Sequence, residues 1–274
     1  TYPPMRECIP RGHRKSNVFP IRDDNPQLLV PYATYGIIAL NVLAWVFVQG
    51  LGSNPALAGS ICNLGLIPAE LLGAVPDGYR IQFGAQAYCE LGGSSWLTVF
   101  TSMFMHGGWL HIIGNMWFLW IFGDNVEDAM GSFRFVLFYL LCGAAAAGLQ
   151  VAANTESTIP MVGASGAIGG VMGAYVLLYP RVHVHLLIFL GFFVTTIAVP
   201  AVFMLGYWFL VQVLGGFSSI GARGGVAFWA HVGGFAAGAL FVLLFRNPKL
   251  LGKHPYYGWK KRSPNSNWRR IDRR

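Results

Sequence analysis

The sequence predicts an all-α membrane protein in which six transmembrane helices form one bundle. Three observations predict this fold class. The mean hydropathy is +0.50. Hydrophobic residues make up 54% of the chain and charged residues 11%, which is less than half of the charged fraction that is usual in soluble domains. Apolar segments close to the roughly 20 residues that cross a bilayer recur along the chain.

Six apolar segments are the candidate spans, and the shorter ones are expected to end below the membrane surface. They are Tyr32–Leu51, Gly107–Phe122, Phe133–Ala153, Ser165–Pro180, Pro200–Gly215 and Val226–Phe245. Residues 186–216 form an apolar stretch that is too long for one span and too short for two. We therefore expect residues 186–199 to be a loop that dips into the membrane interface, with Pro200 in the first turn of the next helix.

The positions of Lys and Arg predict how the chain is oriented. Of the 19 basic residues, ten lie in residues 246–274 and five in residues 1–31. Positive residues beside spans stay in the cytoplasm, so both termini are expected there, and the number of crossings is then even. The chain divides into a basic N-terminal tail (1–31), a membrane domain (32–245) and a basic C-terminal tail (246–274). The connection 124–134 fits this orientation less well, because it carries three acidic residues against one arginine.

The net charge of +8 does not require a nucleic-acid partner. Residues 255–262, PYYGWKKR, mix basic and aromatic side chains, which is typical of a segment that lies on anionic lipid headgroups. Nucleic-acid binding is the less favoured alternative for such a tail. The lipid bilayer is therefore the expected partner.

The connection Gly52–Ser95 is long, and loops of this length tend to carry structure of their own. We expect it to lie partly in the outer membrane interface, with short helices near Pro68–Gly73. Cys62 and Cys89 both fall in this loop. A disulfide and two free thiols remain equal alternatives, because spacing in sequence does not determine geometry. The chain has no ligand spacing typical of zinc sites, so no metal is expected.

Ser165 and His231 are the candidate catalytic pair. Ser165 stands in the run MVGASGAIGG (161–170), and His231 stands in AHVGGFAAG (230–238). A hydroxyl and an imidazole are costly in apolar membrane segments, so their presence there indicates function. A serine nucleophile with a histidine base is the chemistry that this combination favours.

Glycines recur at helical spacing beside both residues, which favours close contact of two helices. Gly169 and Gly173 share a helical face with Ser165. If the two glycine faces meet, the serine and imidazole come within about 2.6–3.2 Å. The alternative is ordinary helix packing in which the serine bonds to its own helix. The glycines expected at the contact are Gly163, Gly166, Gly170, Gly234 and Gly238.

His111 and Asn115 form a third cluster in HGGWLHIIGN (106–115). They stand four residues apart and so share one helical face. An acyl-transfer site needs donors aimed at the oxyanion, and an asparagine amide suits that role. The alternative is that Asn115 bridges two helices while His111 caps a helix at the interface. Beside a serine and histidine pair, the oxyanion role is favoured.

Over roughly residues 95–245 the sequence resembles the rhomboid family of intramembrane serine proteases. GASG (163–166) looks like the family's Gly-x-Ser-Gly nucleophile motif, and AHVGG (230–234) looks like its catalytic-histidine helix. The spacing of His111 and Asn115 is similar to the family's oxyanion pair, and EDAMGSFRF (127–135) resembles the turn into its third helix. All four occur in the family's order.

The resemblance implies a rhomboid-like six-helix bundle with a Ser–His dyad and no cofactor. Ser165 would attack the scissile carbonyl, with His231 as general base and then general acid. The backbone N–H of Ser165, with Asn115 and His111, would hold the oxyanion. The implied substrates are single-span membrane proteins, admitted when the helix at residues 200–215 moves aside. Short tails and six spans suit a bacterial inner-membrane enzyme.

Two positions depart from the family pattern. A loop pair that is often Trp-Arg reads Trp96-Leu97, and the aromatic residue often found four positions after the serine is replaced by Gly169. A second hypothesis is a catalytically silent, rhomboid-like accessory or structural subunit of a larger membrane complex with an unknown partner. A transporter is a weaker hypothesis, because inverted repeats and charged residues that would couple ions are missing from the spans.

Overall fold

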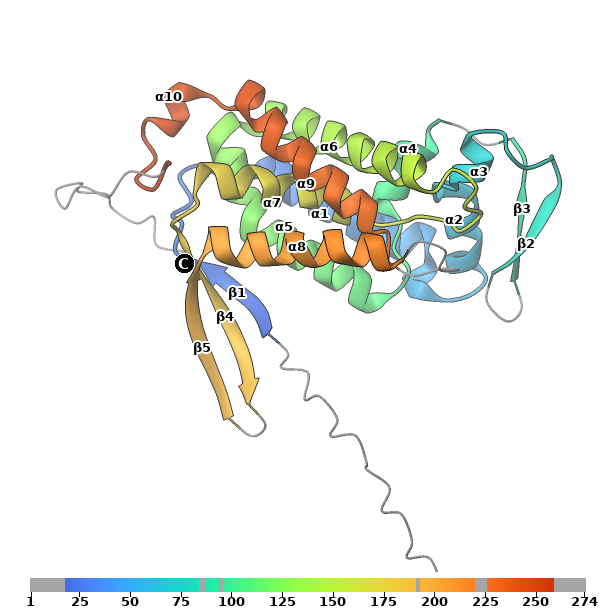
Figure 1. Cartoon of the computed structure of the whole chain (residues 1–274), viewed down its shortest axis with the longest axis horizontal. Helices are drawn as coiled ribbons and strands as arrows, with labels where there is room; N and C mark the ends of the chain where they lie inside the picture. The colour runs from blue at the N-terminus through green and yellow to red at the C-terminus, as the bar shows by residue number, and fades with distance from the viewer. Residues whose placement is uncertain (1–17, 84–86, 94–95, 191–192, 220–225, 259–274) are drawn as a thin grey trace, which may run out of the picture.

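The computed structural model describes residues 18–83, 87–93, 96–190, 193–219 and 226–258. The fold is mostly helical, and the longer helices lie side by side in one bundle (Figure 1). Residues 1–17 and 259–274 of the two predicted tails lie outside the described residues. The helices of the bundle are α1 (Tyr32–Leu43, continued by a π-helical turn, Ala44–Val48), α5 (Trp109–Met130), α6 (Ser132–Ala153), α7 (Ser165–Leu178), α8 (Ala201–Ser218) and α9 (Phe228–Phe245), followed by the short α10 (Pro248–Leu251).

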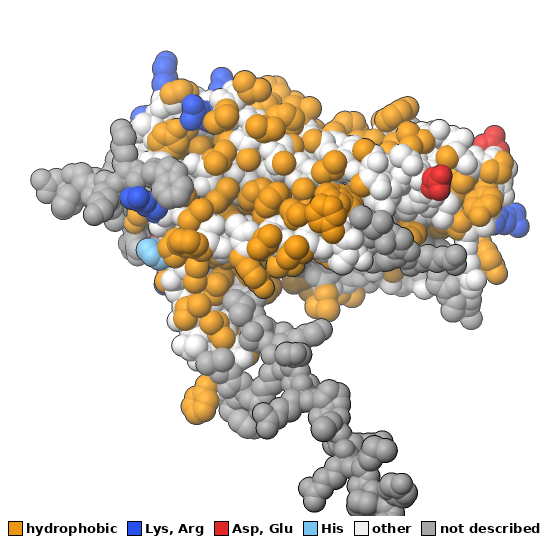
Figure 2. All heavy atoms as spheres, in the orientation of Figure 1, with side chains coloured by type: hydrophobic (Ala, Val, Ile, Leu, Met, Phe, Trp, Pro, Cys, Tyr) orange, Lys and Arg blue, Asp and Glu red, His pale blue; other side chains and the backbone are white. Residues whose placement is uncertain are grey.

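Three helices in the described part of the chain are long and apolar enough to cross a membrane, namely α6, α8 and α9. Two shorter apolar helices accompany them, α1 with its π-helical turn and α7. Figure 2 shows hydrophobic side chains along the whole length of the bundle, while Lys and Arg gather mainly near α10 at one end. Large apolar side chains such as Leu110, Phe203 and Leu244 are exposed. A surface of this kind is typical of a protein embedded in lipid.

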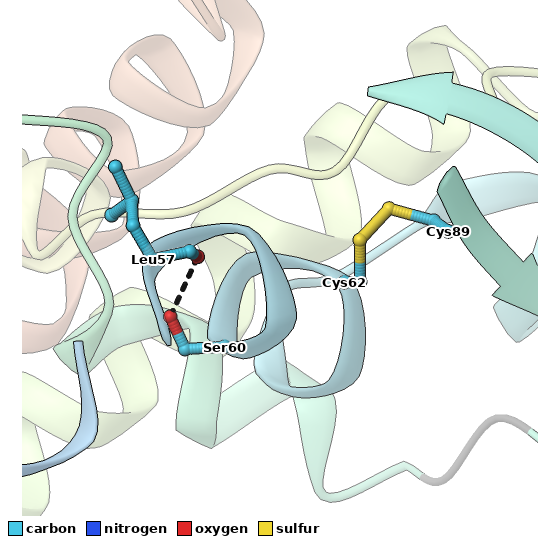
Figure 3. The surroundings of a disulfide bond; sticks show 4 residues. All are labelled: Leu57, Ser60, Cys62 and Cys89. Carbon is cyan, nitrogen blue, oxygen red and sulfur yellow. Dashed lines mark hydrogen bonds between the residues drawn. A yellow bond between two sulfur atoms is a disulfide. The ribbon is translucent and has the colours of Figure 1, made fainter. Parts of the chain in front are cut away.

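The connection between α1 and α5 is built from short elements. They are a 3₁₀ turn (Gly50–Gly52), α2 (Ala56–Leu64), α3 (Pro68–Leu71), the hairpin β2 (Tyr79–Phe83) and β3 (Ala87–Leu91), α4 (Thr98–Thr101) and a second 3₁₀ turn (Ser102–Phe104). Helix α3 lies where short helices were expected. Of the two alternatives for the cysteines, the structure has the disulfide Cys62–Cys89, which ties α2 to β3 with the two Cα atoms 5.3 Å apart (Figure 3).

The expectation of an all-α fold is wrong in two places, at the hairpin of β2 and β3 and between α7 and α8. Between α7 and α8 the chain forms an antiparallel hairpin, β4 (His183–Leu190) and β5 (Phe193–Pro200), and β1 (Val18–Asp23) adds a third strand beside β4. β5 (FVTTIAVP) is rich in β-branched residues, which favour strands. A bare loop would leave many backbone N–H and C=O groups unpaired, whereas the hairpin pairs them. The sheet projects sideways from the end of the bundle where α7 ends and α8 begins (Figure 1).

The expected connection Asp124–Arg134 is also not a loop. Helix α5 continues to its end at Met130, and Gly131, with a φ of 82°, is the single residue before α6. The acidic residues therefore lie in the last turns of α5, where Glu127 accepts hydrogen bonds from the backbone N–H groups of Ala33 (3.0 Å) and Thr34 (2.8 Å). The Glu127 carboxylate therefore caps the start of α1 and is not a free charge on a membrane surface.

Candidate active site

Ser165 is the first residue of α7, and the chain is held firmly as it approaches this helix. Met161 exchanges two backbone hydrogen bonds with Leu66, of 2.9 and 2.7 Å, and Gly163 N–H donates to the carbonyl of Ser102 at 2.9 Å. Gly163 has a φ of 125°, a backbone conformation that residues other than glycine rarely adopt. The start of a helix carries a partial positive field. Ser165 is therefore fixed at a point that favours developing negative charge.

His231 lies in the first turn of α9 and faces Ser165. Its Nε2 atom is 2.8 Å from Ser165 Oγ, within the distance that proton transfer from a hydroxyl to an imidazole requires. Both residues are half-buried. The structure thus brings together the two residues that sequence reasoning paired, although they come from different helices.

Contact between the backbones of α7 and α9 sets this distance. A Cβ atom placed on Gly234 would overlap the carbonyl oxygen of Gly166, and one placed on Gly238 would overlap that of Gly170. On α7, a Cβ atom placed on Gly170 would lie only 2.5 Å from Cys142 Cβ, so position 170 has no room for a side chain. Small residues permit this approach inside a membrane. Of the five glycines expected at the helix contact, Gly163 instead lies before α7 and faces His111.

His111 and Asn115 of α5 converge on the loop that leads to Ser165. A Cβ atom on Gly163 would meet His111 Nε2 at 2.6 Å and Asn115 Nδ2 at 3.6 Å. Gly107 N–H donates to His111 Nδ1 at 3.3 Å, so Nε2 carries the proton of the neutral ring and is a donor. Asn115 is 7% exposed, and its Nδ2 has no hydrogen-bond partner among the described residues. Two donors therefore meet at this loop.

Two residues of α8 support His231, and the sequence analysis missed both. His231 Nδ1 lies 2.7 Å from Gln212 Oε1. The ring of Trp208 lies beside the imidazole, with centroids 5.7 Å apart and planes tilted by 36°. In the sequence, Gln212 could have been noticed as a glutamine within an otherwise apolar span, because a polar side chain there needs a hydrogen-bond partner.

Trp208 also lies beside Gly169, the position of α7 at which the family often has an aromatic residue. A Cβ atom on Gly169 would lie 3.1 Å from the carbonyl oxygen of His231 and 3.8 Å from the Trp208 ring. Larger side chains at position 169 would push against the backbone of α9. The imidazole therefore has an aromatic neighbour, but from α8 instead of α7.

A cavity of about 20 Å³ lies beside Ser165, and Ser102, Gly163 and Ala230 are among the residues that line it. A space of this size holds about one water molecule. Among the described residues, no group of three or more His, Cys, Asp or Glu side chains is placed to bind a metal ion. The chemistry available here is that of a hydroxyl, an imidazole and neutral hydrogen-bond donors.

Comparison with known proteins decides the family. The model of the Rhomboid domain matches residues 93–248, more than half of the chain. The chain belongs to the rhomboid family. Rhomboid protease GluP of Bacillus subtilis is 35% identical over 209 residues, which cover 76% of this chain and 34% of that protein. RHOMBOID-like protein 4 of Arabidopsis thaliana is 33% identical over 157 residues, 57% of this chain and 34% of that protein.

A shorter rhomboid relative matches over more of its own length. The putative rhomboid protease YdcA of Bacillus subtilis is 30% identical over 165 residues, 57% of this chain and 67% of that protein. By contrast, the chain spans about a third of the length of GluP and of RHOMBOID-like protein 4. The rhomboid membership and the apolar helices identify an integral membrane protein whose relatives include proteins named as proteases.

Proposed function

We propose that this rhomboid is an intramembrane serine endopeptidase that cleaves single-span membrane proteins. The observation that carries the proposal is the hydrogen bond of 2.8 Å between Ser165 Oγ and His231 Nε2 at the start of α7. A serine hydroxyl needs an adjacent base to become a nucleophile at neutral pH. This pair supplies nucleophile and base within an apolar bundle.

In the proposed reaction, Ser165 Oγ attacks the carbonyl carbon of the scissile peptide bond while His231 Nε2 takes its proton. The tetrahedral intermediate then expels the amine, to which the imidazolium returns that proton, and an acyl-enzyme remains. Water, deprotonated by the same imidazole, attacks the ester and releases the new carboxyl end and the free serine. Peptide hydrolysis needs no cofactor in this scheme.

The oxyanion of each tetrahedral intermediate would be held by three donors. These are the backbone N–H of Ser165, Asn115 Nδ2 and His111 Nε2. The backbone N–H stands at the first position of α7, where no partner exists within the helix. The convergence of the two side chains on Gly163 supports their assignment. Donors fixed in advance stabilise developing charge without reorganisation during the reaction.

The proposed arrangement in the bilayer has six crossings, made by α1, α5, α6, α7, α8 and α9, with both termini in the cytoplasm. Ser165 then begins a helix that runs inward from the non-cytoplasmic side, and the site opens to that side. The concentration of basic residues after α9 supports this orientation. A bacterial inner membrane is the location that we propose.

The second candidate function is a silent accessory subunit of a membrane complex. The hydrogen-bonded dyad favours the protease, because a subunit without activity has no need to keep serine and histidine at bonding distance. In the accessory case, a partner would cover the site and prevent access to Ser165.

The test is cleavage of a reporter single-span protein reconstituted with this chain in lipid vesicles. We expect cleavage by the natural sequence and none by Ser165→Ala, which keeps the helix packing intact. Ser53→Ala is the matched control, since it makes the same substitution at an exposed serine between α1 and α2 and should retain cleavage. Equal cleavage by Ser165→Ala would remove Ser165 as nucleophile. Absence of cleavage across several reporters would favour the accessory function.

A further inference from the structure

We propose that Gln212 is a positioning residue that fixes the tautomer and the orientation of His231. This inference rests on the proposed function, because it assigns to α8 a part in preparing the catalytic base. The contact is direct, since Gln212 Oε1 lies 2.7 Å from His231 Nδ1, on the side of the ring opposite to Ser165.

The second hydrogen bond of Gln212 determines which end of its amide faces the imidazole. Gln212 Nε2 donates to the backbone carbonyl of Trp208 at 3.3 Å. With the NH₂ group engaged there, the carbonyl oxygen Oε1 is the atom that faces His231. An oxygen can only accept, so Nδ1 must carry the proton of the neutral ring. Nε2 is then an acceptor for the Ser165 hydroxyl, which is the state that a general base needs.

The burial of Gln212 indicates that a glutamine occupies this position because its side chain bonds to His231. Helix α8 is otherwise apolar along its described length apart from Tyr207 and a serine at its end, and much of its surface faces outward. Gln212 is 7% exposed and lies on the inward face, in line with Leu205. A buried amide without hydrogen-bond partners destabilises the fold. Both ends of this amide are satisfied in the structure, one by Trp208 and one by His231.

An amide suits this place better than a carboxylate. A buried carboxylate within a membrane segment would carry a large desolvation cost, whereas a neutral amide selects the tautomer without added charge. One neutral hydrogen bond biases the tautomer equilibrium by about tenfold. Loss of the amide would let the ring turn or carry its proton on Nε2, which presents a donor to Ser165 and cannot act as base.

The first test measures kinetics in vesicles with Gln212→Met, which keeps the length of the side chain but has no acceptor oxygen. We expect kcat to fall about tenfold with KM unchanged, because the substrate does not contact this residue. Gln212→Glu, whose buried carboxyl group is neutral, keeps a carbonyl oxygen as acceptor for Nδ1–H and should recover most of the lost rate. Unchanged kcat in Gln212→Met would overturn the inference.

Gln150→Met is the matched control. Gln150 Oε1 accepts from the backbone N–H of Ala230 at 3.1 Å, so this glutamine also bonds to the start of α9 but does not touch the imidazole. The same substitution there should leave kcat unaltered in the folded protein. An equal loss of kcat in both variants would mean that any weakening of α9 lowers the rate, and a specific role for Gln212 would be excluded.

The second test reads the tautomer itself and does not depend on activity. The chain has seven histidines, so the ¹⁵N resonances of labelled His231 are assigned by their loss in His231→Gln. We expect a protonated Nδ1 and an unprotonated Nε2 in the natural sequence, and a mixture in Gln212→Met. A proton found on Nε2 in the natural sequence would overturn the inference. If the expected tautomer is found but no reporter is cleaved, only the protease proposal fails.

Discussion

Helix α5 carries buried polar side chains near both of its ends, and two of them, Asn115 and Glu127, differ in how completely they are hydrogen-bonded. Near its start, Asn115 is buried with an Nδ2 that has no partner among the described residues. Near its end, both oxygens of the Glu127 carboxylate accept hydrogen bonds. The two side chains lie about 12 residues apart, or roughly 18 Å along one helix.

The Glu127 carboxylate joins three segments of the chain. It accepts from the N–H groups of Ala33 and Thr34, from Thr34 Oγ1 at 2.8 Å and from Ser132 Oγ at 2.6 Å. It therefore connects the start of α1, the end of α5 and the start of α6. Asp128 does the same for the approach to α1, where it accepts from two successive backbone N–H groups, at 2.6 and 2.8 Å.

The comparison teaches how to separate structural from functional polar groups in a membrane bundle. A buried group whose hydrogen bonds are complete stabilises the fold, since a membrane offers no water to replace a lost partner. A buried donor that lacks a hydrogen-bond partner and lies near a nucleophile is available to bind a ligand or a reaction intermediate. Substitutions at the two ends of α5 should therefore affect different quantities.

The largest expected effect is on stability, in Glu127→Ala. The change removes the acceptor for four hydrogen bonds, and several donors stay buried. At roughly 1 kcal/mol or more for each unsatisfied donor, the free energy of unfolding should fall by about 4 kcal/mol. Chemical unfolding in micelles measures this free energy. Cleavage of a reporter is measured on the same variant and divided by the folded fraction.

Ser132→Ala is the graded control for Glu127→Ala. It removes one of the four donors and leaves the other three bonded to the carboxylate, so its loss of stability should be about 1 kcal/mol. The assignment of Glu127 to the fold fails if Glu127→Ala unfolds like the natural sequence while its rate per folded molecule drops.

The next effect is on rate, in Asn115→Ala. If the open Nδ2 holds the oxyanion, cleavage should slow by about 10²–10³, the usual cost of losing one such donor. The free energy of unfolding should change little, because no hydrogen bond of the resting protein is lost at this nitrogen. Cleavage kinetics and unfolding are measured on the same preparation. An unchanged rate would take Asn115 out of the oxyanion assignment.

The same contrast explains how much of the site the sequence predicted. Ser165, His231 and Asn115 stand out because a hydroxyl, an imidazole and an amide each interrupt apolar helical segments, and the structure brings all three to the start of α7. Gln212 also interrupts an apolar span, but its partner is 19 residues away on another helix, and spacing along one helix does not reveal it.

The fold was predicted less well where an apolar segment is compatible with both a membrane-interface loop and a β-strand. In residues 183–200 the side chains are apolar enough for a membrane interface and β-branched enough for a strand, and composition alone does not distinguish the two. The hairpin also depends on pairing with β1, about 165 residues away in the sequence. The acidic residues before α6 were assigned to a loop because the partners of Glu127 and Asp128 lie more than 90 residues earlier in the sequence.

A smaller effect than those of Glu127→Ala and Asn115→Ala concerns His254, a buried titratable group that follows α10. It is 7% exposed and packs against Tyr179, with ring centroids 4.5 Å apart. Its Nδ1 accepts from the backbone N–H of Tyr256 at 3.3 Å, which requires an unprotonated nitrogen. Burial lowers the pKa of His254 from 6.5 to about 4, because the charged imidazole loses its hydration.

A lowered pKa in the folded protein fixes the direction of the pH effect. The neutral ring is favoured on folding, so its contribution to stability is complete above pH 6.5 and is lost as the pH falls toward 4. Between pH 7.5 and pH 5 this group should lower the free energy of unfolding by about 2 kcal/mol. His254→Phe keeps the contact with Tyr179 but does not titrate, so unfolding of this variant should lose less stability over the same interval. Equal losses in both proteins would show that other groups cause the acid sensitivity and that His254 does not contribute to it.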